Sequence, residues 1–174
     1  MAATPAATKI ALISTLALSL TAVVDYLRRR APSHEIEPGF TGRYLLFLGL
    51  LFLVRVVGQR VVLRASPSWL PPMKQWNRLP YGFLFPVQLV FVLVIALMVA
   101  DFLAGPWFFA EPNAGFGRVA VVFSFVYAGS MVVRYVVQMT RRPEARWFGG
   151  TIPMVFHIVL ASFLFVLGTY HASY

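Results

Sequence analysis

The stretch that decides the fold is FLFPVQLVFVLVIALMVADFL, residues 83–103, whose one ionisable side chain, Asp101, comes near its end. About 20 mainly apolar residues in an α-helix cross the roughly 30 Å of hydrocarbon in a bilayer, and this stretch has that length. Backbone polar groups in hydrocarbon must be hydrogen bonded within the segment, which only a helix achieves in a single stretch. We therefore predict a membrane-spanning helix here.

Four other apolar stretches have a similar length. They are residues 5–26, 44–63, 119–139 and 152–170. None alternates polar and apolar residues as the strands of a membrane β-barrel do. The connections between them are short, and none leaves room for a soluble domain. The sequence predicts an all-α integral membrane protein in which residues 1–174 form a single bundle of five helices, or four if one stretch does not span.

The composition excludes several classes of protein. Hydrophobic residues make up 59% of the chain and charged residues 12%, whereas a soluble domain is about 45–50% apolar and roughly 25% charged. There is no cysteine, which excludes disulfides, thiolate catalysis and cysteine-bound metal centres. The net charge of +9 comes from residues between the apolar stretches. These charges are typical of topology determinants and contacts to anionic lipid headgroups, not of nucleic-acid binding.

The distribution of Lys and Arg predicts the orientation. If all five stretches span, one side receives ten of them, namely Lys9, Arg55, Arg60, Arg64, Lys74, Arg78, Arg134, Arg141, Arg142 and Arg146. The other side receives five, namely Arg28, Arg29, Arg30, Arg43 and Arg118. If the second stretch only dips into the membrane, the count becomes 13 against 2. Residues 45–54 are apolar all round, which favours five spans because an interfacial helix needs a polar face.

Both alternatives give the same sidedness for the rest of the chain. Residues 64–82 and 140–150 are expected on the cytoplasmic side, and the C-terminus on the opposite side. The expected location is a bacterial inner membrane or a photosynthetic or respiratory membrane. Basic and aromatic residues in these two loops are expected to contact anionic headgroups or a partner. They are Arg64, Lys74, Arg78, Arg141 and Arg142, with Trp69, Trp76 and Trp147.

Four charged residues lie within or at the ends of the predicted spans: Asp25, Arg55, Asp101 and Arg134. Ionisable residues in a membrane are functional candidates by default. Each of these is also near enough to a predicted end for its charged group to reach the surface, Arg55 over the longest distance. A proton or ion path would need such groups at graded depths, and the sequence shows no such series.

Two histidines lie on the last apolar stretch. His157 and His171 share one helical face and are about 21 Å apart along the axis, a spacing similar to that of the haem ligands in di-haem b-type cytochromes. A neutral imidazole in a dry pocket can ligate haem or the magnesium of a chlorophyll-type pigment. The second ligand would come from a methionine such as Met98 or Met131, or from another chain. The alternative is a packing histidine hydrogen bonded to a neighbouring helix.

Small residues predict where helices approach one another. Gly150, His157, Ala161 and Gly168 share a face of the last stretch, which we expect to be the main packing element. Ala11, Thr15, Ser19 and Ala22 share a face of the first stretch. Metalloprotease, nucleophile-elbow and phosphate-loop signatures are absent from the sequence, which favours a role other than catalysis.

These features together favour an accessory or structural subunit of a larger membrane complex, such as an energy-transducing one. Small size, abundant aromatic residues and basic loops fit a protein that packs against partner subunits and anionic lipid. The second alternative is an electron-transfer or light-harvesting subunit that binds haem or (bacterio)chlorophyll through His157 and His171. A small transporter is the third.

Overall fold

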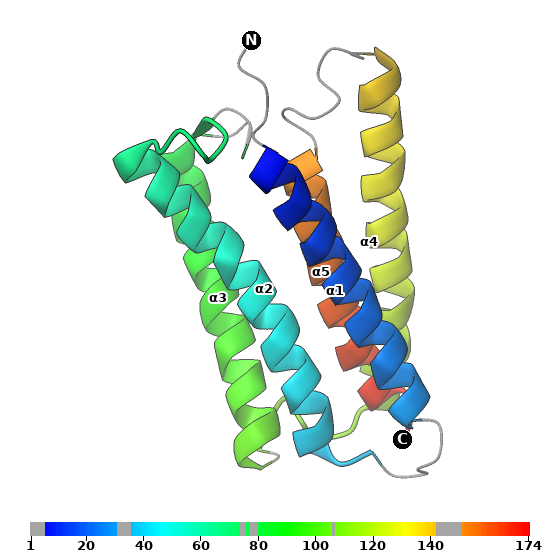
Figure 1. Cartoon of the computed structure of the whole chain (residues 1–174). Helices are drawn as coiled ribbons and strands as arrows, with labels where there is room; N and C mark the ends of the chain where they lie inside the picture. The colour runs from blue at the N-terminus through cyan, green and yellow to red at the C-terminus, as the bar shows by residue number, and fades with distance from the viewer. Residues whose placement is uncertain (1–5, 31–35, 74–75, 77–79, 106, 142–150) are drawn as a thin grey trace.

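The computed structural model describes residues 6–30, 36–73, 76, 80–105, 107–141 and 151–174. It contains five α-helices, and the described residues include no strand (Figure 1). All five helices are long and apolar enough to cross a membrane. This confirms the predicted all-helical fold with five long apolar segments. The helices are α1 (Ala6–Arg30), α2 (Pro38–Ala65), α3 (Tyr81–Ala104), α4 (Ala114–Arg141) and α5 (Thr151–His171).

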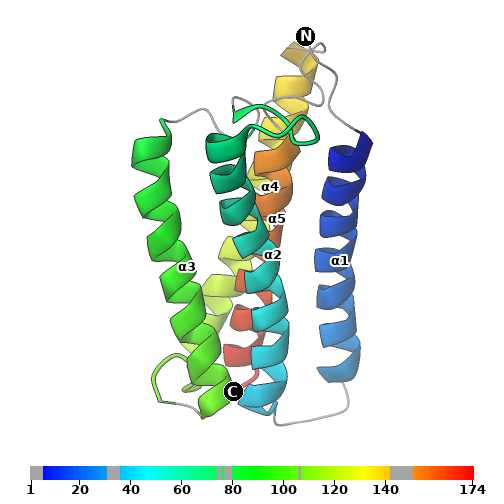
Figure 2. The same ribbon diagram turned by 60° about the vertical axis from the view of Figure 1, so that its left-hand side comes forward.

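Consecutive helices run in opposite directions, so that the start of α1 and the end of α5 lie at opposite ends of the bundle (Figures 1 and 2). We call these ends the Ala6 end and the His171 end. The described residues between α2 and α3 lie at the Ala6 end, and residues 107–113 lie at the His171 end. This up-and-down order is the one expected when every connection is short.

The second helix bears on the choice between four and five spans. α2 is one continuous helix of 28 residues that packs along α3 and α5. It begins with Pro38, whose missing N–H costs nothing in the first turn. It ends at Ala65, and the N–H of the following Ser66 donates to the carbonyl of Val62 over 3.0 Å. α2 is thus as long and apolar as the other candidate spans.

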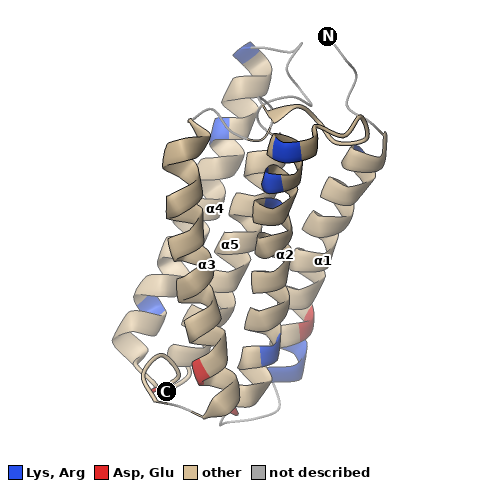
Figure 3. Cartoon of the chain, turned by 90° about the vertical axis from the view of Figure 1, so that its left-hand side faces the viewer, with Lys and Arg blue, Asp and Glu red and all other residues tan. Residues whose placement is uncertain are grey.

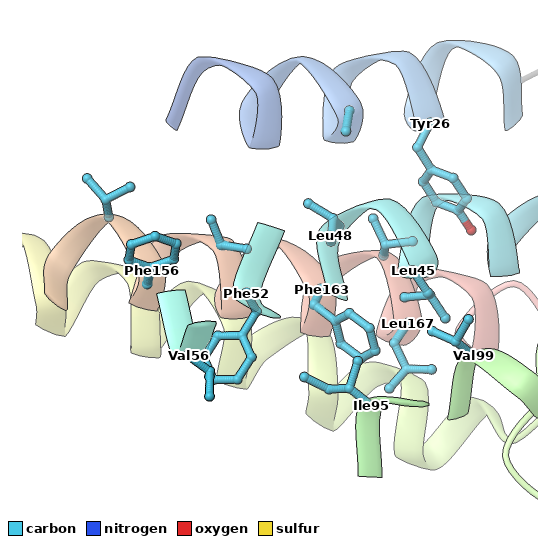
Figure 4. Packing of buried hydrophobic residues seen from close by; sticks show 14 of the residues in the cluster. Tyr26, Leu45, Leu48, Phe52, Val56, Ile95, Val99, Phe156, Phe163 and Leu167 are labelled. Atoms are coloured by element: carbon cyan, nitrogen blue, oxygen red, sulfur yellow. The ribbon is translucent and has the colours of Figure 1, made fainter. Parts of the chain in front are cut away.

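α5 is the central helix of the bundle. Of its most apolar 18 residues 61% are buried, against at most 39% in any other helix. It packs on α4, α2 and α1, while α3 packs on α2 (Figure 2). Figure 4 shows Phe163 and Leu167 of α5 packed with Leu45 and Leu48 of α2. The prediction that this segment is the main packing element is confirmed.

Glycines let α4 and α5 approach closely. A Cβ on Gly168 would lie 2.8 Å from the backbone nitrogen of Val121, and a Cβ on Gly117 would lie 2.6 Å from the carbonyl carbon of His171. No side chain can therefore stand between the helices at this crossing. The small face predicted on this segment is confirmed at Ala161 and Gly168, which are buried; Gly150 lies outside the described residues.

The small face predicted on the first segment is only partly correct. Ser19 and Ala22 are buried, but Ala11 is exposed because the neighbouring Leu12 takes the inward position. A leucine side chain makes more van der Waals contacts with the neighbouring helices than an alanine does, and this favours the rotation of α1 that turns Leu12 inward.

Charged residues gather toward the two ends of the bundle (Figure 3). Between the ends, α1, α2, α3 and α4 expose many large aliphatic and aromatic side chains. All the acidic residues that the structure describes lie toward the His171 end, whereas basic residues occur at both ends. These acidic residues are Asp25, Glu37, Asp101 and Glu111.

The glycine crossing gives a prediction in which two substitutions differ in sign. Gly117→Ala should lower the thermal midpoint of the purified protein in detergent, because its Cβ would overlap the α5 backbone; overpacking of this kind costs about 1–3 kcal/mol. Gly129→Ala, on the open face of the same helix, should leave the midpoint unchanged or raise it, since alanine favours a helix over glycine. Circular dichroism on heating measures both midpoints. If the two substitutions changed the midpoint equally, the close approach of α4 and α5 at Gly117 would be contradicted.

Candidate functional site

The buried face of α2 carries a cation where its neighbours are apolar. Buried residues recur every three or four positions along the helix, and Arg55 and Gln59 fall on this face beside Phe52 and Val62. Arg55 is only 7% exposed. Its guanidinium carbon lies 5.9 Å from the centre of the Phe156 ring on α5. Arg55 therefore turns into the bundle, where an aromatic face offsets part of the cost of desolvating its charge.

Two carboxamides lie at the same level as Arg55. Gln59 on α2 is completely buried and Gln88 on α3 is 4% exposed. Two contacts show how the antiparallel helices α2 and α3 are aligned. The guanidinium of Arg60 lies 5.2 Å from the centre of the Phe85 ring, and Gly49 faces Ile95. This alignment places Gln88 of α3 beside the turn of α2 between Arg55 and Gln59.

These polar groups have unused hydrogen-bonding capacity. Within the described part of the chain, the Nε of Arg55 and the side-chain nitrogen and oxygen of both Gln59 and Gln88 are buried without a hydrogen-bond partner. Buried donors and acceptors are almost always paired in proteins, so each such group calls for a specific explanation. We call Arg55, Gln59 and Gln88 the polar cluster.

A second pair of polar residues joins α4 to α5 close to Arg55. The hydroxyl of Tyr127 and the Nδ1 of His157 form a hydrogen bond, and their rings meet edge to face with centres 5.6 Å apart. Arg55 is near enough to interact electrostatically with both residues, and Arg134 with His157. The sequence-based prediction that His157 faces another helix is confirmed. The hydrogen bond leaves the Nε2 of His157 as the atom that could ligate a metal, and cofactor binding stays a prediction.

The two aspartates among the candidate intramembrane charges are occupied by local structure. Asp25 accepts hydrogen bonds from the Nε of Arg29 at 2.9 Å and the hydroxyl of Tyr44 at 2.6 Å. Asp101 accepts from the backbone N–H groups of Trp107, Phe108 and Ala110. Both lie toward the His171 end, so among the described residues no carboxylate neutralises Arg55. Arg134 is exposed on α4.

The second histidine lies far from the polar cluster. His171 is 3% exposed, and its ring meets the rings of Phe102, Phe116 and Tyr170. It borders a hollow of about 580 Å³ that Met98 also lines. The two histidines are thus at opposite ends of α5, each beside different helices. Ligation of a cofactor by His171, with Met98 as a second ligand, stays a prediction.

The basic and aromatic residues predicted at the membrane surface fall into three groups. Arg64, Arg141 and Trp69 are exposed at the Ala6 end. Trp76 is buried instead, since its indole N–H donates to the carbonyl of Pro71 and its ring fills the space beside Gly58. Four further residues of this set lie outside the described residues: Lys74, Arg78, Arg142 and Trp147.

Sequence reasoning missed three members of the site: Gln59, Gln88 and Tyr127. A carboxamide inside an apolar stretch is a signal that could have found the first two, because it is costly against lipid. Tyr127 carries no comparable signal, since tyrosine is common in membrane helices. The chain matches no protein-family model, no curated protein and no solved structure.

The polar cluster gives a stability prediction. Arg55→Met should raise the thermal midpoint of the purified protein by the equivalent of about 1 kcal/mol, because replacing a buried charge by an apolar side chain of similar length removes its desolvation cost. The matched control is Arg134→Met, which should change little because Arg134 is exposed. A large loss of stability in Arg55→Met would contradict this prediction and would mean that the Arg55 side chain makes a stabilising interaction in the bundle.

Proposed function

We propose that the chain is an integral membrane protein whose five helices cross the bilayer, and that it serves as an accessory subunit of a larger membrane complex. The observation that carries this proposal is the exposed surface of α4. Among the helix pairs in extensive contact, α4 packs on α5 alone, although it has 28 residues. Most of its apolar surface is therefore free to meet lipid or another protein.

One face of α4 has the pattern of a helix–helix interface. Small or β-branched residues recur at alternating spacings of three and four, and all of them are exposed. This spacing keeps a seam in contact with a second helix that crosses at about 20°. We call these residues the valine stripe: Val119, Val122, Val126, Gly129, Val133 and Val136.

Exposed small or β-branched residues recur at this spacing on α1 as well, at Ala7, Ile10, Ser14, Ala17, Thr21 and Val24. What sets α4 apart is that it packs on α5 alone, whereas α1 packs on both α5 and α2. Its row also consists of stiff valines with an open notch at Gly129, which has no neighbouring atom within 4 Å, and this suits the close approach of a second helix. These two features support a protein partner on α4.

The charges support an orientation. Lys9, Arg60, Arg64 and Arg141 lie at the Ala6 end, together with the described residues between α2 and α3. Because Lys and Arg concentrate on the cytoplasmic side of membrane proteins, we place the Ala6 end in the cytoplasm. The exposed Arg64, Arg141 and Trp69 would then contact anionic headgroups of the inner leaflet in a bacterial inner, photosynthetic or respiratory membrane.

The orientation is testable by single-cysteine labelling, since the chain has no cysteine of its own. A cysteine in place of the exposed Ser68 should react with a membrane-impermeant maleimide only from the cytoplasmic side, and one in place of the exposed Glu111 only from the opposite side. Intact cells and inverted membrane vesicles supply the two sides. Reaction of both positions from the same side would exclude the five-span arrangement.

The partner surface is testable in the native membrane. Val126→Trp and Gly129→Leu should each reduce the amount of chain found in a large complex at least tenfold, because both fill the seam where a second helix would pack. The matched control is Val90→Trp on α3, a valine with nearly the same exposure (60% against 63%). Native electrophoresis after mild detergent extraction measures the complex. Migration of the wild-type chain as a free 19.5 kDa monomer would contradict the proposal.

A second candidate function is passage of a small anion through the bundle, because the polar cluster offers a guanidinium and two carboxamides but no carboxylate among the described residues. The Arg55→Met variant tests it as well. If this function is correct, wild-type proteoliposomes release chloride at least tenfold faster than protein-free liposomes, Arg55→Met abolishes the difference and Arg134→Met preserves it. Equal release from wild-type and protein-free liposomes would exclude chloride passage.

A further inference from the structure

A groove of about 500 Å³ runs between α1 and α2 at the His171 end. Both helices contribute apolar residues to its floor and polar residues to its rim. The floor is formed by Leu18, Ala22, Phe40 and Phe47, and the rim by Thr21, Asp25, Arg29, Arg43 and Tyr44.

The groove has a structural cause. Tyr26 of α1 is completely buried; its ring stacks on Phe40 at 5.7 Å and its hydroxyl hydrogen bonds to Thr41 at 3.2 Å. This contact joins the two helices on their inner side. On the side that lines the groove, α1 offers the small residues Thr21 and Ala22, which do not fill the space between the helices.

The rim carries more positive than negative charge. The carboxylate of Asp25 already accepts hydrogen bonds from Arg29 and Tyr44. Its hydrogen bond to Nε fixes the Arg29 guanidinium, whose terminal N–H groups stay available. Arg43 has no hydrogen bond or ion pair to any described residue, and Arg28 adds a further exposed cation one residue before Arg29. The rim thus attracts an anion.

These arginines lie on the side where the orientation rule predicts few of them. Two of the five Lys and Arg residues on the proposed non-cytoplasmic side, Arg29 and Arg43, line this groove. Since the tendency of Lys and Arg to lie on the cytoplasmic side does not account for these two, a ligand for them is the better explanation. Guanidinium groups bind phosphate through paired hydrogen bonds, and are the side chains best suited to it.

The depth of the groove fits one acyl chain. Leu18 lies 11 residues before Arg29 on α1, which is about 16 Å along the helix. This is close to half of the roughly 30 Å hydrocarbon thickness, and so to the depth of one leaflet. An apolar chain on the floor would therefore reach from the level of Arg29 to near the middle of the bilayer.

We propose that the groove between α1 and α2 binds an acidic phospholipid, with its phosphate at Arg29 and Arg43 and one acyl chain along Leu18, Ala22 and Phe47. The headgroup of the proposed lipid carries no ammonium group, so its phosphate has no internal counter-charge and can pair with the arginines. The inference rests on the proposed insertion into a membrane but not on the partner at the valine stripe. The result for the valine-stripe variants, whichever it is, therefore does not bear on the lipid site.

The test measures lipid retained by the purified protein in native mass spectrometry, with phosphatidylglycerol and phosphatidylcholine as probes. We expect phosphatidylglycerol to bind at least tenfold more tightly. Arg43→Gln should weaken this binding about fivefold, and combined with Arg29→Gln more than twentyfold, as expected from about 1 kcal/mol for each basic residue. Arg118→Gln, at the same end but on α4, is the control and should change the binding less than twofold. Equal weakening by Arg43→Gln and Arg118→Gln would overturn the site.

A second pair of variants tests the acyl chain with the arginines intact. Leu18→Trp should fill the groove and reduce phosphatidylglycerol binding at least tenfold, whereas Leu20→Trp, equally exposed but outside the groove, should not. Thr21→Trp repeats the test from the groove rim if Leu18→Trp does not fold. Soluble glycerol phosphate should not displace the lipid at equal concentration. Displacement by glycerol phosphate, or unchanged binding in the folded groove variant, would overturn the proposal.

Discussion

The contact between α4 and α5 at Gly117 and Gly168 sets the position of the helix around which the bundle is built. Lipid tails are as apolar as the side chains, so helices in a membrane gain little from hydrophobic association and depend on close van der Waals contact. The two glycines allow the backbones themselves to meet. Once α5 is held there, its other faces receive α1 and α2, and α3 follows through its own contact with α2 at Gly42 and Gly49.

Polar groups have different roles in different parts of this bundle. At the His171 end, Asp25 and Asp101 are satisfied by neighbours that they position, and the hydroxyl of Tyr170 donates to the carbonyl of Ala110. At the same end the Nδ1 of His171 is buried without a partner among the described residues. Deeper in the bundle, the polar cluster brings several such atoms together. A satisfied group stabilises the fold, whereas an unsatisfied one costs free energy unless something else binds it. The polar cluster is for this reason the better candidate for a function inside the bundle.

The outer surface is also divided by chemistry. The valine stripe on α4 is smooth and stiff, and the groove between α1 and α2 combines an apolar floor with a basic rim. The first surface suits another helix and the second suits a lipid molecule. They belong to different helices, so the proposed partner on α4 and the proposed lipid between α1 and α2 would not compete for the same surface.

The sequence by itself determined that the chain has five long apolar helical segments and approximately where they lie, because the length and hydropathy of a segment are local properties. It also identified α5 as the packing helix through Ala161 and Gly168. It did not determine which face of each nearly uniformly apolar helix turns inward, since all faces have similar hydropathy. Only the tertiary structure decided that Arg55 points into the bundle, that Trp76 is buried against Gly58 of α2, and that Gln59, Gln88 and Tyr127 join the site. These outcomes depend on which neighbours fill the space around each side chain, and that is fixed only when α5 packs between α4 and α2.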